Sequence, residues 1–209
     1  MERLKFFMVL SAIIIMITWS NCSLDVPVDY SKIITGEGPV IKQVIQADTF
    51  SIFSHLSIGN VYITTGDSLE VYVKAQQNIF DEMAFEFKDG YFGWGFNEQI
   101  RIEQSDTIML VINMPNAIEG VQVGGVGTIN IRGNKQEDIY IEVFGIAEIN
   151  SYNLEVDSCD IYIPGNATCY FRVNNELTGL ISGIGNVYYK GEPQISVVIT
   201  GQGDVIEDN

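Results

Sequence analysis

Four side chains able to bind an anion recur at nearly regular intervals in the second half of the sequence. They are Arg132, Tyr152, Arg172 and Lys190, separated by 20, 20 and 18 residues. Guanidinium groups pair with carboxylates, and an aromatic ring offers a face to a sugar. On successive strands about 4.8 Å apart, the two arginines would lie roughly 10 Å apart. This spacing suits an extended acidic glycan. The alternative is a solvated edge whose charges pair weakly with nearby carboxylates.

We find no constellation of residues that is typical of catalysis. A glycoside hydrolase needs two carboxyl groups roughly 5–10 Å apart in a groove. Asp157, Asp160 and Asp204 are candidates only because they are acidic, and the chain has 27 such residues. The single histidine, His55, falls on a column otherwise held by valine or isoleucine, where we expect a hydrogen-bonded, partly buried ring. We therefore predict no catalytic residues, no cofactor and no enzymatic activity.

Cys159 and Cys169 leave two interpretations open. In an exported protein a disulfide between them is allowed. Both, however, fall on core-facing positions, where a free thiol packs as a small apolar group. A metal site is not expected, because no third or fourth ligand lies nearby in the sequence.

A cluster of aromatic residues interrupts the first half of the chain. Tyr91, Phe92, Trp94 and Phe96 alternate with glycines. Such rings could form a secondary platform for sugars. We prefer a hairpin that caps the apolar end of a repeat structure, because such an end must be covered for solubility.

The elements that must position all these residues are encoded by a short repeated phrase. Apolar residues occupy the even offsets on both sides of its first glycine, which is the pattern of strands with one buried face. The spacing of 20, 20, 18 and 18 residues is too short for a helical crossover. It predicts an all-β, single-stranded parallel β-helix, a solenoid with rungs of about 18–20 residues; an antiparallel sandwich is the alternative. The five copies begin at Gly125, Gly145, Gly165, Gly183 and Gly201.

The first residues predict export. A basic start is followed by a largely apolar run, Phe6–Trp19, and then by Cys22. This is typical of a signal peptide over residues 1–21 rather than of a membrane span. Cys22 resembles the lipidated cysteine of bacterial lipoproteins, which would anchor the chain to a membrane; an ordinary signal peptide with an incidental cysteine is the alternative. Residues 22–39 are polar and contain prolines, which predicts a tether.

The charge balance excludes some partners. Eleven basic and 27 acidic residues give a net charge of −16. So large an acidic excess disfavours nucleic acid and anionic membrane surfaces. It also opposes edge-to-edge association of β-strands.

The repeated phrases resemble the family called putative auto-transporter adhesin, head GIN domain. The resemblance rests on Ser57–Val61, Gly183–Val187 and Gly201–Val205, and most specifically on Ser182–Pro193. It covers about residues 40–208, although alanines replace glycine in two middle copies. The resemblance implies a right-handed parallel β-helix on a lipid-anchored envelope protein, commonly in Bacteroidota. It brings no catalytic residues.

We therefore expect a signal peptide, a tether and one β-helix domain over residues 40–209. The expected function is that of a non-catalytic outer-membrane lipoprotein of the cell envelope, an adhesin that binds a glycan or a protein. A polysaccharide lyase or hydrolase is an alternative by analogy of fold alone. A structural spacer in the envelope is another.

Overall fold

The computed structural model describes residues 32–97, 100–105 and 107–208. The predicted signal peptide, Cys22 and the tether as far as residue 31 lie outside these ranges. Residues 32–35, within the predicted tether, form a strand. Across the described ranges, the structure has no helix with the length and apolar character needed to span a membrane.

Nearly all the described secondary structure is β, with one short helix, α2 (Gln77–Phe80). The strands before residue 115 are β1 (Lys32–Thr35), β2 (Val40–Ile45), β3 (Ile52–His55), β4 (Asn60–Thr65), β5 (Glu70–Gln76), β6 (Met83–Lys88), β7 (Tyr91–Phe96), β8 (Ile100–Gln104) and β9 (Met109–Met114). Those that follow are β10 (Gly120–Val123), β11 (Val126–Arg132), β12 (Gln136–Val143), β13 (Ile146–Ile163), β14 (Asn166–Ile181), β15 (Ile184–Lys190), β16 (Gln194–Ile199) and β17 (Val205–Glu207).

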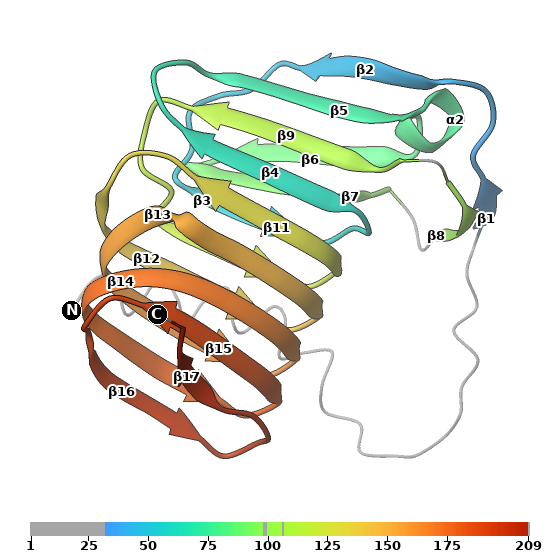
Figure 1. Ribbon diagram of the computed structural model, residues 1–209. Helices are drawn as coiled ribbons and strands as arrows, with labels where there is room; N and C mark the ends of the chain where they lie inside the picture. Colours follow the sequence, from blue (N-terminus) through green and yellow to red (C-terminus); the bar gives the residue numbers. More distant parts are fainter. Residues whose placement is uncertain (1–31, 98–99, 106, 209) are drawn as a thin grey trace. The chain divides into compact units, whose positions relative to one another are not determined.

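Fifteen strands form one sheet that curls on itself (Figure 1). We call one side the front flank; its order is β2-β5-β9-β4-β11-β13-β14-β15-β17. The other side, the back flank, runs β6-β7-β3-β10-β12-β13-β14-β16. The long strands β13 and β14 belong to both flanks, because the first half of each pairs in front and the second half behind. Strands β1 and β8 form a separate parallel pair.

The prediction of a right-handed parallel β-helix solenoid is wrong, although the all-β class is correct. The sheet is mixed: β5 turns back and pairs antiparallel with β2 and β9, and β6 pairs antiparallel with β7. Apart from β2, these strands lie within residues 64–120, where the repeated phrase cannot be read. Strands β13 and β14 also bend through both flanks without a break, so separate rungs of equal length do not describe the chain.

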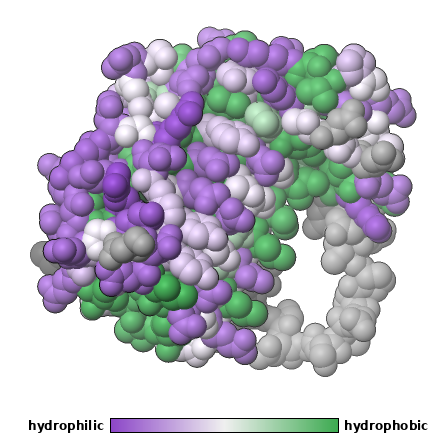
Figure 2. Space-filling model, viewed as in Figure 1, coloured by the Kyte–Doolittle hydropathy of each residue, from purple (hydrophilic) through white to green (hydrophobic). Residues whose placement is uncertain are grey.

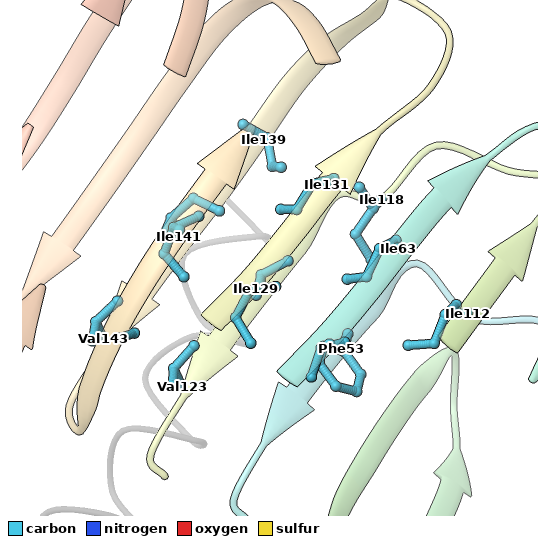
Figure 3. Close-up of a cluster of buried hydrophobic side chains, with 14 of the residues drawn as sticks. Phe53, Ile63, Ile112, Ile118, Val123, Ile129, Ile131, Ile139, Ile141 and Val143 are labelled. Atoms are coloured by element: carbon cyan, nitrogen blue, oxygen red, sulfur yellow. The ribbon is translucent and has the colours of Figure 1, made fainter. Parts of the chain in front are cut away.

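Within this mixed sheet, the columns of the repeat pair residue for residue in parallel ladders. Val123 pairs with Val143, and Ile163 pairs with Ile181, which pairs with Ile199. The side chains of the two flanks meet between them and form one apolar core (Figure 3). The alternation of apolar residues therefore fixed which face of each strand is buried.

The first glycine of each phrase is required by the stacking of backbone on backbone. A Cβ at Gly145 would lie 2.0 Å from the carbonyl oxygen of Gly125, and one at Gly183 would lie 2.1 Å from that of Gly165. Real Cβ atoms do not approach so closely. The glycines of successive phrases thus pass directly over one another at the corner between the flanks.

Candidate functional site

The four residues of the predicted anion column all lie on the front flank, but they do not form one straight column. Arg172 pairs directly with Lys190 on the next strand. Arg132 pairs with Asn153 rather than with Tyr152. The reason is a bulge in β13: the register with β14 shifts between Ser151 and Glu155. The drop in glycine spacing from 20 to 18 residues shows that β13 has two more residues than β14, but it does not show where they lie along the strand.

The bulge nevertheless leaves Tyr152 close to Lys190. The Lys190 Nζ lies 5.0 Å from the centroid of the Tyr152 ring, in cation–π range. The Tyr152 hydroxyl donates a hydrogen bond of 2.6 Å to Oδ2 of Asp208. Partial burial, together with the Asp208 carboxylate, raises the pKa of the Tyr152 phenol above its usual value. The hydroxyl therefore remains a proton donor and already holds one carboxylate.

Two further tyrosines continue the site along the front flank. Tyr170 pairs with Tyr188, and their rings stack with centroids 5.2 Å apart and an interplanar angle of 15°. Tyr152 meets Tyr170 edge to face, at 5.5 Å and 71°. We call Tyr152, Tyr170 and Tyr188 the tyrosine ladder. Sequence reasoning missed the last two, although both stand five residues after a phrase glycine on an outward offset.

The two arginines differ in their surroundings. Both are exposed. Arg132 donates from Nε to Thr64 Oγ1 at 3.1 Å. Arg172 has no hydrogen bond or ion pair with any residue that the structure describes. It stands beside Lys190 at the end of the ladder, so this pair concentrates positive charge in an acidic chain.

The ladder favours hydrogen bonding and charge over the stacking of a sugar ring. Tyr170 and Tyr188 use a ring face on each other, and Lys190 lies against Tyr152. What remains for a ligand is phenolic hydroxyls and ring edges, together with the cations of Arg172 and Lys190. Such groups bind carboxylates or sulfates through charge-assisted hydrogen bonds.

The sequence matches the family described as "Putative auto-transporter adhesin, head GIN domain" over residues 53–149 and again over residues 121–193. The two matches together span more than half of the chain. The chain belongs to this adhesin family. No curated protein matches it.

Solved structures resemble this adhesin-family protein at low sequence identity, and the first of the three that follow shares its fold. A putative adhesin from Bacteroides fragilis NCTC 9343 is 16% identical with a TM-score of 0.53, covering 84% of this chain and 100% of that one. A putative adhesin from Parabacteroides merdae ATCC 43184 is 14% identical with a TM-score of 0.42, covering 85% and 99% of the two chains. A putative lipid binding protein from Parabacteroides distasonis ATCC 8503 is 14% identical with a TM-score of 0.43, covering 85% and 100%. None of these three is named as an enzyme.

The aromatic cluster of this adhesin-family protein belongs largely to the core. Phe92 and Trp94 are fully buried, whereas Tyr91 and Phe96 are half-buried. Phe92 stacks on Phe87 of the neighbouring strand, with ring centroids 4.2 Å apart. Phe92 and Trp94 are therefore not available to a ligand. The β6–β7 hairpin forms the two strands at one end of the back flank, and Phe92 and Trp94 point from β7 into the core.

His55 is buried more completely than we predicted. It is fully buried, its Nε2 lies 3.3 Å from the Val126 carbonyl oxygen, and its ring centroid lies 5.0 Å from that of Trp94. Burial lowers the pKa of His55 to about 4. The ring is therefore neutral at physiological pH, as a core residue must be.

Cys159 and Cys169 are buried free thiols in the structure. Burial raises the pKa of Cys169 to about 12 and that of Cys159 well above its usual value. Both thiols therefore stay protonated and unreactive. Among the described residues, no group of three or more His, Cys, Asp or Glu side chains could hold a metal ion.

The acidic residues weighed as hydrolase candidates are separated and engaged elsewhere. Asp157 accepts one hydrogen bond from Asn174, and its Oδ1 lies 2.7 Å from Lys135 Nζ. Asp160 lies on the back flank and accepts from Thr178, whereas Asp204 precedes β17 on the front flank. These carboxylates do not converge on one groove.

Proposed function

We propose that this protein is a non-catalytic protein of the cell envelope that binds an acidic glycan at the tyrosine ladder and the adjacent cations. The observation that carries the proposal is the hydrogen bond from the Tyr152 hydroxyl to the Asp208 carboxylate. It shows that a carboxylate can bind to this phenol, next to the Lys190 ammonium. A uronic acid of a polysaccharide presents the same group. Membership of an adhesin family supports a binding role at the envelope or surface.

An acidic ligand fits the ladder better than a neutral one. The chain has 11 basic residues against 27 acidic ones, yet Arg172 and Lys190 stand side by side at the ladder. Each hydrogen bond to a charged group contributes about 1.5–3 kcal/mol. A neutral sugar would accept hydrogen bonds from the two cations without an opposite charge of its own, and would find few free ring faces.

Titration calorimetry with a polyuronate and a matched neutral polysaccharide tests the proposal. We expect binding of the polyuronate that weakens with salt. The double variant Arg172→Ala/Lys190→Ala should weaken it at least about tenfold. Arg132→Ala should weaken it less, because Arg132 is engaged with Thr64. Asp208→Asn should strengthen binding, because it removes a competing carboxylate.

Lys42 provides a matched control on the same flank. Its Nζ lies 3.8 Å from the centroid of the Tyr72 ring, so it forms a lysine–tyrosine pair like that of Lys190 but outside the ladder. Lys42→Ala should leave binding unchanged. Equal binding by the double variant and the wild type, or equal loss in Lys42→Ala, contradicts the proposed site.

Anchoring through lipid on Cys22 is part of the same proposal. The supporting feature is the apolar run before this cysteine. Incorporation of labelled fatty acid into the wild type but not into Cys22→Ala is the expected result. Equal labelling of both chains, or labelling of neither, contradicts the anchor without affecting the ladder.

A further inference from the structure

The strand β16 is a free edge of the large sheet. It pairs only with β14, so no described strand pairs with its other side. An open edge presents unpaired backbone N–H and C=O groups to any other strand.

The side chains of β16 leave the core open at this end. Ile195 and Ile199 pair with Leu177 and Ile181, which are fully buried, yet they are themselves 38% and 39% exposed. Val198, on the outward face, is 58% exposed. Figure 2 shows apolar side chains gathered over β16. A patch of this kind on an otherwise acidic chain marks an interaction surface.

Charge distinguishes β16 from every other free edge that the structure describes. The stretch from Gln194 to Gly203 contains no charged residue. Charged residues on edge strands are a common defence against edge-to-edge pairing. The other described edge strands carry Lys42 in β2, Glu86 and Lys88 in β6, Glu207 in β17, Lys32 in β1, and Arg101 and Glu103 in β8.

We propose that β16 pairs antiparallel with β16 of a second copy of this chain, forming a two-fold dimer. Two copies with a net charge of −16 each repel one another over most of their surfaces. An uncharged edge is where they can approach, and antiparallel pairing of one strand with itself is self-complementary. The pairing satisfies the backbone of β16 and covers Ile195, Val198 and Ile199. It joins the two back flanks into one continuous sheet.

Sedimentation velocity of the full chain in mild detergent, over a concentration series, tests the dimer. We expect the wild type to dimerise and Val198→Lys to raise the dimer dissociation constant at least about tenfold, because it places like charges across the new ladder. Val44→Lys is the matched control: Val44 is 59% exposed on the edge strand β2, which already carries Lys42.

Each outcome decides the proposal. A dimer in the wild type and in Val44→Lys, but not in Val198→Lys, supports it. A monomer at all concentrations overturns it, including the case in which β16 instead binds a strand of an unlike protein. Equal dimerisation by all three chains also overturns it. Thermal unfolding of each variant shows whether the chain is folded, because substitutions at these exposed positions should leave the fold intact.

Discussion

The two ends of the curled sheet carry the same alternation of apolar residues and bury them to different degrees. At the end formed by β5, β6, β7 and β9, the closed end, Trp94 and Ile112 are fully buried. At the end formed by β16 and β17, the open end, Ile195 and Ile199 remain more than one third exposed. Antiparallel strands and Ile79 of α2 complete the core at the closed end. Among the described residues, nothing comparable follows β16.

The difference shows that the alternation of apolar residues along a strand determines which face of the sheet each side chain points to. It does not determine how completely that side chain is buried. Ile112 and Ile199 both point to the interior of the sheet, and both pair with apolar neighbours. Their contributions to stability differ because further strands and a helix complete the core at the end where Ile112 lies, whereas no described strand covers Ile199. The contribution scales with the area that is actually removed from water. The closed end therefore stabilises the fold, and the open end remains available for association.

The sharpest way to break this comparison is to make the same truncation at both ends. Ile112→Ala should lower the free energy of unfolding by about 2–5 kcal/mol, because it leaves a cavity in a closed core. Ile199→Ala should cost less than about 1 kcal/mol, because much of its side chain is already in water. Chemical denaturation at low protein concentration measures both. Equal losses would mean that the open end is buried in solution.

A pH titration examines the core beside the closed end through His55 of β3, whose ring lies against Trp94. Its pKa is lowered from 6.5 to about 4 in the folded protein. The folded state therefore takes up its proton later than the unfolded state as the pH falls. The His55 contribution to stability is complete above pH 6.5, is lost between pH 6.5 and about 4, and reaches about 3 kcal/mol in total. Denaturation of the wild type and of His55→Leu across this range measures the difference in slope. Identical slopes contradict the buried neutral ring.

The sequence was sufficient to predict the all-β class, the family and the parallel pairing of the apolar columns from Val121 to Ile199, apart from the bulge in β13. It succeeded there because the period-2 alternation and the phrase glycines act locally, one strand on the next. It failed at residues 64–120, where β5 reverses direction and an aromatic hairpin replaces the phrase. Whether a strand pairs parallel or antiparallel depends on distant neighbours, which no local pattern records. The prediction of a β-helix was wrong because it applied the parallel pairing of the repeated phrases to residues 64–120, where strands pair antiparallel.

The site was predictable to a similar extent. The spacing placed Arg172 and Lys190 side by side, since β14 and β15 pair without interruption there. It misplaced Tyr152 relative to Arg132, because glycine spacing does not give the position of the bulge within β13, and the register shifts before Arg132 reaches its partner Asn153. Tyr170 and Tyr188 share one outward offset, five residues after a phrase glycine, so their pairing could have been predicted. Their contact with Tyr152 depends on the bulge and could not be predicted.

Substituting alanine for phrase glycines compares the interior of the repeat with its open end. Gly145 is enclosed, because a Cβ would lie 2.0 Å from the Gly125 carbonyl oxygen and Gly165 stacks on its other side. Gly145→Ala should cost about 1–3 kcal/mol through overpacking. Gly201 has the same contact with Gly183 but stands at the open end, where its strand can move away, so Gly201→Ala should cost less. Thermal denaturation orders the two; the reverse order contradicts the open end.

Thiol reactivity compares the interior with the open end at little cost to stability. In a Cys22→Ser background, Cys159 and Cys169 should react with an aromatic disulfide reagent only as fast as the sheet opens, because both thiols are buried and protonated. Ile199→Cys adds a thiol at a position that is 39% exposed, and this thiol should react first and in a separate phase. The dimer adds a further expectation: the fast phase should slow as protein concentration rises, since pairing of β16 covers residue 199. A fast phase that is independent of protein concentration would mean that the open end is exposed but does not pair. It would support the exposure of residue 199 and contradict the dimer.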